Sequence, residues 1–128
     1  MKEPVWLDQE DVLAIHDKML SQHGGLAGLR DEGLLQSALG KPLNLFAYGK
    51  PTLSQLAASY AAGIILNHPF LDGNKRTGFM TAAAFIEING YDFTADEADA
   101  TVKTLALAAH ELNEAGYADW LKANSRKT

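Results

Sequence analysis

The hydrophobic residues of this chain recur mostly at the spacing of amphipathic α-helices. In the first such segment Val12, Ile15 and Met19 fall on one helical face. Asp8 precedes them as a predicted N-cap, and a Gly-Gly pair follows the segment. This pattern predicts a helix over residues 9–22.

The next segment predicts a short helix followed by irregular structure. Asp31 is the predicted N-cap of a helix that runs through Leu39 and ends at Gly40 and Pro42. Residues 40–52, GKPLNLFAYGKPT, hold two Gly-Lys-Pro triplets around apolar residues, which predicts a loop or loose hairpin. Such a loop is either a packed surface segment or a functional one.

The middle of the chain predicts two central helices. Ser54 is the predicted N-cap of the first, and its stretch LAASYAAGIIL is apolar on nearly every side, as in a buried helix. Pro69 ends it, and after a polar loop a second helix is predicted over residues 74–89. Residues 91–93 are predicted to be extended.

The C-terminal part predicts two further helices. Thr94 is the predicted N-cap of a helix through Leu112, and a last short helix holds Tyr117 and Trp120. The final residues, SRKT, are expected to fray. The whole pattern predicts an all-α protein of about six helices, with residues 1–128 forming a single domain.

Composition narrows the class of protein. The chain has 128 residues, 47% of them hydrophobic, which suits one soluble domain. Its net charge of −5 argues against broad nucleic-acid binding, and the lack of cysteine excludes disulfides and thiolate metal sites. No apolar stretch is long enough to span a bilayer, and the start lacks the apolar run of a signal peptide. A cytoplasmic location without membrane contact is expected.

One stretch, HPFLDGNKRTG at residues 68–78, concentrates the candidate chemistry. Gly73 favours a turn and Asn74 is a predicted N-cap, so the backbone N–H groups of residues 73–76 would form an anion-binding cradle. Lys75 and Arg76 stand in the first helical turn, where the helix dipole repels each cation by about 0.3–1 kcal/mol. A bound polyphosphate would reverse this repulsion, which favours a phosphate site.

Two side chains of the motif suit catalysis. His68 is a candidate general base, because histidine is the side chain that most often takes this role near neutral pH. Asp72, beside the cradle, is a natural Mg²⁺ ligand next to bound phosphates. Each residue alone has a structural alternative: His68 as a helix C-cap, Asp72-Gly73 as a turn, and the two cations as a solvated face. Phe70 is predicted to be a core anchor for the loop.

The remaining histidines are weaker candidates. His16 lies on the apolar face of the first helix and is predicted to be a core residue, while His23 is predicted at a helix end. His110 lies on the late helix without evident partners. No pair has metal-ligand spacing, and no nucleophile elbow supports Ser-His-Asp catalysis.

The motif at residues 68–78 resembles the signature of the Fic/Doc family. Fic proteins have Gly-Asn-Gly-Arg and a second arginine three residues later. Here Lys75 replaces the last glycine and Phe79 replaces the second arginine, and both departures favour the Doc branch. The upstream HGGLAGLRDEGLLQSAL also resembles Doc proteins, so the resemblance covers roughly residues 5–122.

The resemblance implies a Fic fold, with the active-site loop between two central helices. It implies that His68 is the base and that Asp72 binds Mg²⁺ and orients the substrate hydroxyl. Residues 40–52 would be the flap that positions the target peptide. The anion hole would be formed by Gly73, Asn74, Lys75 and Arg76, with Asn74 also touching metal or phosphate.

By the same resemblance, the chain would be a toxin that transfers the γ-phosphate of ATP to a threonine of elongation factor Tu and arrests translation. Lys75, with the loss of the second arginine, would turn the γ-phosphate toward the base. Alternatives are an AMP transferase and a catalytically silent antitoxin-binding protein. The chain has no Fic-type inhibitory motif, so control by a Phd-type antitoxin is expected, with a tail that folds in a groove near the first helix or residues 40–52.

Overall fold

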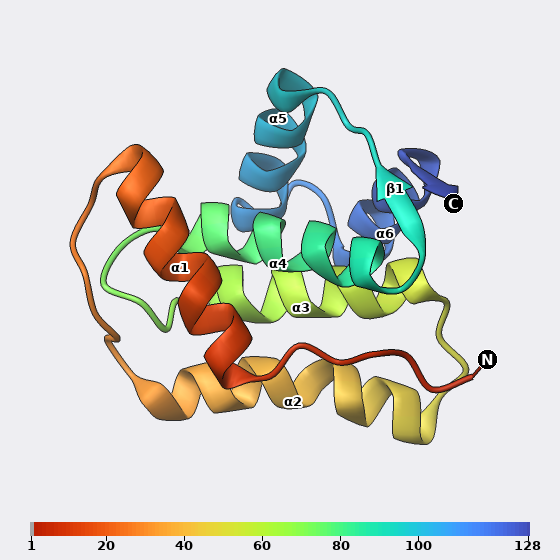
Figure 1. Ribbon diagram of the computed structural model, residues 1–128, viewed down its shortest axis with the longest axis horizontal. Helices are drawn as coiled ribbons and strands as arrows, with labels where there is room; N and C mark the ends of the chain where they lie inside the picture. Colours follow the sequence, from red (N-terminus) through yellow and green to blue (C-terminus); the bar gives the residue numbers. More distant parts are fainter. Residues whose placement is uncertain (1) are drawn as a thin grey trace.

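The structure is a computed structural model that describes residues 2–128 (Figure 1). Within these residues the chain forms six helices and two short strands. The predominance of helix confirms the all-α prediction. The elements are α1 (Gln9–His23), α2 (Glu32–Tyr48), α3 (Leu53–Asn67), α4 (Asn74–Ile88), β1 (Tyr91–Phe93), α5 (Glu97–Ala108), α6 (Glu114–Ala123) and β2 (Ser125–Lys127). No helix of this described part is long and apolar enough to cross a membrane.

Helix α3 lies at the centre of the fold. Every residue from Leu56 to Ile65 is buried, because α2, α4 and α6 pack around it. Helices α3 and α4 run side by side in opposite directions, and the loop between them closes one end of the pair (Figure 1). Gly78 permits their close approach, since a Cβ there would lie 2.7 Å from Cγ1 of Ile65. The last glycine of the motif therefore has a packing role.

Helix α2 does not end where the sequence predicted. It continues through Gly40 and Pro42 to Tyr48, so the prediction of a loop or hairpin over residues 40–52 was wrong. Pro42 removes the amide that would bond the Ala38 carbonyl. That carbonyl instead faces Gly63 of α3, where a Cβ would come within 3.0 Å of the Ala38 oxygen. The packing of α2 on α3 at this contact stabilises the helical conformation, although Gly40 and Pro42 disfavour it.

Two predicted N-caps are displaced by two residues. Helix α3 is capped by Thr52, which forms a capping box with Gln55, and Ser54 lies inside the helix. Helix α5 is capped by the side chain of Asp96 instead of Thr94. Each helix start has two short polar residues that could act as the N-cap, and the sequence alone does not distinguish between them. The backbone geometry determines which of the two caps the helix.

The C-terminal tail is ordered and does not fray as predicted. Residues 125–127 form β2, which pairs antiparallel with the predicted extended segment β1, so that Tyr91 faces Lys127. The amide of Thr94 donates to the carbonyl of Asn124, which extends this pairing. Helix α5 ends at Ala108, so His110 lies in the following turn and not on the helix as predicted.

Candidate active site

The loop of residues 68–73, named here the motif loop, joins the two central helices as predicted. His68 is the C-cap of α3 and adopts left-handed backbone angles, φ 56° and ψ 54°. Its side chain is exposed, while Pro69 and Phe70 are buried. Phe70 thus anchors the motif loop in the core, as predicted, and His68 is displayed at its entrance.

Asn74 does not cap α4 as predicted, because Gly73 occupies the N-cap position and provides no side-chain bond. The Asn74 side chain is buried and turns back into the motif loop. Its Oδ1 accepts from the Phe70 amide and its Nδ2 donates to the Phe70 carbonyl, both at 3.0 Å. Both polar atoms of the side chain therefore bond within the protein. Within the described part of the chain, the group of Asn74 that stays free at the start of α4 is its backbone N–H.

The predicted cradle included the amide of Gly73, but that amide donates to Oδ1 of Asp72, so the free donors begin at Asn74. The backbone N–H groups of Asn74, Lys75 and Arg76 donate to no acceptor in residues 2–128. The side chains of Lys75 and Arg76 are exposed, and neither forms an ion pair within the same residues. Three unpaired donors and two cations at a helix N-terminus produce a local positive potential.

Asp72 stands at the edge of this cradle. Its Oδ1 accepts from the Gly73 amide at 2.9 Å, and its Oδ2 accepts from the Leu26 amide at 3.2 Å. The carbonyl of Asp72 accepts from Nε2 of the buried His16 at 2.8 Å. Contacts from outside the motif therefore hold both the backbone and the carboxylate of Asp72. His16 is buried as predicted, but sequence periodicity did not indicate that it supports the motif loop.

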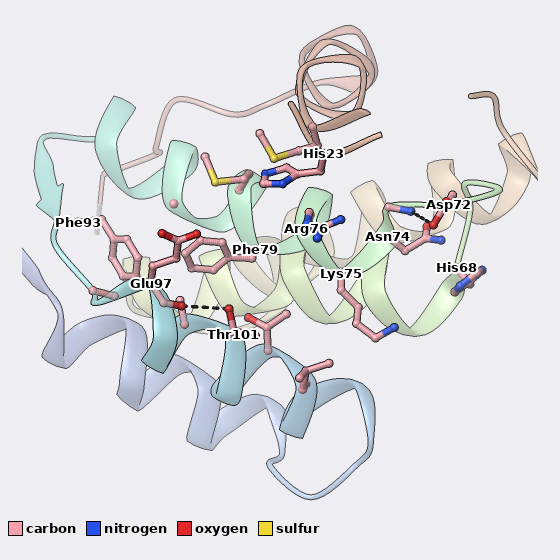
Figure 2. Close-up of a pocket in the computed structure, with 18 of the residues that line it drawn as sticks. His23, His68, Asp72, Asn74, Lys75, Arg76, Phe79, Phe93, Glu97 and Thr101 are labelled. Carbon is pink, nitrogen blue, oxygen red and sulfur yellow. Dashed lines mark hydrogen bonds between the residues drawn. The ribbon is translucent and has the colours of Figure 1, made fainter. Parts of the chain in front are cut away.

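A cavity of about 630 Å³ extends from the motif loop along α4. Figure 2 shows His68, Asp72 and Asn74 at one end, Lys75 and Arg76 in the middle, and Phe79 and Phe93 at the other end. The volume lies within the range of about 300–1,000 Å³ common for small-molecule sites. The structure therefore brings together all six predicted site residues, His68, Asp72, Gly73, Asn74, Lys75 and Arg76.

The far end of the cavity combines aromatic side chains with the carboxylate of Glu97 (Figure 2), and this end was not predicted from the sequence. Phe79 packs against Phe93 and Trp120, with ring centroids 5.8 and 6.2 Å away. Met19 of α1 and Met80 of α4 also line the cavity. These residues come from separate elements, so no local motif could have indicated that they share a surface.

Residues 40–52 contribute nothing to this cavity. The segment beside the motif loop is instead the connection between α1 and α2, residues 24–31, named here the α1–α2 loop (Figure 1). Leu29 and Phe70 form an isolated antiparallel bridge between the two loops. The flap predicted at residues 40–52 is therefore absent, and the α1–α2 loop occupies the place beside the site.

Comparison with known proteins gives the family. The sequence profile of the Fic/DOC family matches residues 6–86, which include α1 to α3, most of α4 and the whole motif. The chain belongs to the Fic/DOC family.

Within the family the relatives are Doc proteins. The chain is 31% identical over 117 residues to "Protein kinase doc" of Escherichia phage P1, covering 91% of this chain and 92% of the relative. It is 38% identical over 94 residues to "Toxin Doc" of Mycolicibacterium smegmatis, covering 71% of this chain and 69% of the relative. These matches confirm the predicted Doc branch, and with it the broad class of a Doc-type toxin.

Proposed function

We propose that this protein is a toxin kinase that transfers the γ-phosphate of ATP to a hydroxyl of a protein, with a threonine of elongation factor Tu as the target. The observation that carries the proposal is the junction of His68 and Asp72 with the unpaired cradle at the start of α4. A base, a carboxylate, free N–H donors and two cations are the groups that phosphoryl transfer requires. The proposed reaction belongs in the cytoplasm.

In the proposed mechanism the imidazole of His68 takes the proton of the target hydroxyl. The hydroxyl oxygen then forms a bond to the γ-phosphorus, and the bond from that phosphorus to the bridging oxygen of ADP breaks. The amides of residues 74–76, with the side chains of Lys75 and Arg76, stabilise the negative charge on the phosphates. The exposed position of His68 lets a protein side chain approach it from solvent.

The site suits magnesium as a companion of the nucleotide. Residues 2–128 contain no group of three or more His, Cys, Asp or Glu placed to enclose a metal, and Asp72 is the carboxylate next to the cradle. Mg²⁺ usually binds through one or two carboxylates together with substrate phosphates, and when bound it neutralises phosphate charge. We propose Asp72 as its protein ligand. The metal contact inferred for Asn74 by resemblance is not proposed, because its side chain is buried and bonds the Phe70 backbone through both polar atoms.

Lys75 and Phe79 support transfer of the γ-phosphate over transfer of AMP. Lys75 adds a cation where Fic proteins have glycine, directly beside the His68 end of the cavity (Figure 2). Phe79, at the position of the second Fic arginine, belongs to an aromatic cluster and provides no charge. The positive charge is thus concentrated next to the base, which favours placing the most highly charged end of ATP there.

The decisive experiment uses purified protein, elongation factor Tu and Mg²⁺, with ATP labelled at the γ or at the α phosphate. Label from γ on the target, lost in His68→Ala by about 100-fold or more, is the expected result. Label from α would show an AMP transferase. If a protein other than elongation factor Tu is labelled from γ, the target is wrong. No ATP turnover with any protein would show a silent binding protein.

Lys75→Gly combined with Phe79→Arg tests the orientation argument. The double variant is expected to transfer label from the α phosphate, and a product unchanged from wild type would contradict the argument. Because Phe79 packs against Phe93 and Trp120, its substitution needs a check of the fold by circular dichroism. Lys75→Gly alone, at an exposed position, serves as the control.

We also propose that the end of the cavity around Phe79 and Phe93 receives the helical tail of a Phd-type antitoxin. The cavity joins α1, α4 and α5 through Met19, Met80 and Leu105, and it continues from this end to the catalytic end. A helix seated there would reach the cradle and block it. This location replaces residues 40–52, which contribute nothing to the cavity, and it retains α1. Met80→Asp should weaken antitoxin binding measured by calorimetry, whereas a substitution at exposed Leu43 of α2 should leave it unchanged.

A further inference from the structure

The α1–α2 loop lies along the motif loop and contacts it through its backbone. The amide of Leu71 donates to the carbonyl of Gly28 at 3.1 Å. The amides of Arg30 and Asp31 both donate to the carbonyl of Pro69, at 2.7 and 3.0 Å. These bonds join two segments about forty positions apart in the sequence, so the position of one loop depends on the other.

One end of the α1–α2 loop holds the Asp72 carboxylate. Oδ2 of Asp72 accepts from the Leu26 amide. Gly25 makes this approach possible, since a Cβ at Gly25 would lie only 2.7 Å from that oxygen. Gly25 also has a φ of +123°, which L-residues rarely adopt. The neighbouring Gly24 has a φ of +76°, but nothing lies within 4 Å of its Cβ position.

The other end of the α1–α2 loop holds His68. Nε of Arg30 donates to the His68 carbonyl at 2.7 Å, and Nη2 donates to the Asn67 carbonyl at 3.0 Å. A guanidinium on these carbonyls stabilises the C-terminal end of α3. It also restrains His68 in a left-handed backbone conformation that is unfavourable for a residue with a Cβ. The direction of the His68 side chain follows from this backbone.

We propose that the α1–α2 loop is the positioning element of the active site, with Arg30 fixing His68 and the Leu26 amide fixing Asp72. The catalytic meaning of this proposal rests on the proposed kinase function. Arg30 and Leu26 are positioning residues, because they act through the motif and need touch neither nucleotide nor target. Since the two contacts serve different side chains, their loss should have separable effects on turnover and on metal binding.

Arg30 is tested with Arg30→Ala and Arg30→Lys. Arg30→Ala should lower kcat about tenfold or more, because small displacements of a catalytic group strongly reduce rate. Binding of Mn²⁺·ADP, followed by electron paramagnetic resonance, should remain unchanged. Arg30→Lys keeps the charge and should recover part of kcat. Arg126→Ala, at an exposed arginine of β2, is the matched control.

Gly25 is tested against Gly24, since both substitutions to alanine carry a backbone penalty. Gly25→Ala should raise the dissociation constant of Mn²⁺·ADP about tenfold, the usual effect of losing a partner of a metal ligand. Gly24→Ala should change it by less than about twofold, because its Cβ meets no neighbour. Equal effects of the two substitutions would overturn the role assigned to Leu26.

Two measurements keep this inference separate from the proposed function. The ¹⁵N shifts of the His68 ring should change in Arg30→Ala, and hydrogen exchange of the Leu26 amide should accelerate in Asp72→Ala. Both can be read even if wild type transfers no phosphate, a result that would contradict only the kinase proposal. If wild type is active but Arg30→Ala keeps both its kcat and its His68 shifts, the positioning role of Arg30 is overturned.

Discussion

The imidazole of His16 lies flat against the ring of Phe70, with centroids 3.8 Å apart and planes 8° apart. The same imidazole bonds the Asp72 carbonyl through Nε2. A carbonyl only accepts, so Nε2 carries the hydrogen of this bond. A single side chain of α1 therefore holds the motif loop at two points, by stacking and by a hydrogen bond.

His16→Ala should lower the free energy of unfolding by about 2–4 kcal/mol, because it leaves a cavity and an unbonded carbonyl. His16→Phe retains the stack and loses only the donor, so its loss should be closer to about 1–2 kcal/mol. Urea denaturation measures both values. Equal losses for the two variants would show that stacking contributes little, and that the hydrogen bond is the dominant contact.

Asn74→Ala should also destabilise the free protein. It leaves the amide and carbonyl of the buried Phe70 without partners, at a cost of about 2–4 kcal/mol. A residue that acted only on metal or phosphate would have no such effect without ligand. Thermal unfolding of ligand-free protein distinguishes the two roles, and an unchanged midpoint in Asn74→Ala would contradict the structural one.

Two helical glycines should respond oppositely to alanine. Gly78→Ala places a Cβ 2.7 Å from Ile65 and should destabilise the protein by about 1–3 kcal/mol. Gly40→Ala, in open space on α2, should stabilise it by about 0.5–1 kcal/mol through helix propensity. Chemical denaturation of the pair gives the test. Destabilisation by both would show that α2 tolerates no change near Pro42.

Stability should fall in strong alkali. Burial raises the pKa of Tyr60 and of Tyr117 to about 12, from an ordinary value of 10.0. The unfolded chain therefore ionises first, and the contribution of each tyrosine is complete below pH 10 and is lost between about pH 10 and 12. The slope should reach about 1.4 kcal/mol per pH unit for each group.

Phenylalanine variants test this alkaline loss. Tyr60→Phe and Tyr117→Phe should each lower stability by about 1 kcal/mol at neutral pH, through hydrogen bonds lost to Leu7 or Thr104. Each should also flatten the decline of the unfolding free energy above pH 10. Tyr48→Phe, at a 90% exposed side chain, is the control. An unaltered decline in both buried-site variants would contradict the assignment.

Much of the fold could be predicted from local sequence. The apolar period placed α1, the buried α3 and α4, because each buries a continuous face or its whole circumference. The extension of α2 could not be predicted, since Gly40 and Pro42 are local helix breakers. The helix continues because α2 packs along α3, with a close approach between Ala38 and Gly63, 25 positions apart.

The candidate site, like the fold, could be predicted only where its residues are close together in the sequence. The motif at residues 68–78 identified the groups around the cradle, because they are adjacent in the chain. Arg30 and Leu26 were not identified, since they act through distant carbonyl and carboxylate groups. Asn74 was misassigned for a related reason: its type suits an N-cap, but the buried backbone of Phe70 requires both of its polar atoms.

The bond from Leu26 to Asp72 uses only a main-chain N–H, which every amino acid except proline provides. The Leu26 side chain takes no part in that bond and is 66% exposed beside the motif loop. Substitutions at this position can therefore alter the surface that an incoming protein meets while the carboxylate keeps its anchor. The exposed surface beside the motif loop and the anchor of the carboxylate are thus divided between the side chain and the backbone of one residue, so the first can change in sequence without loss of the second.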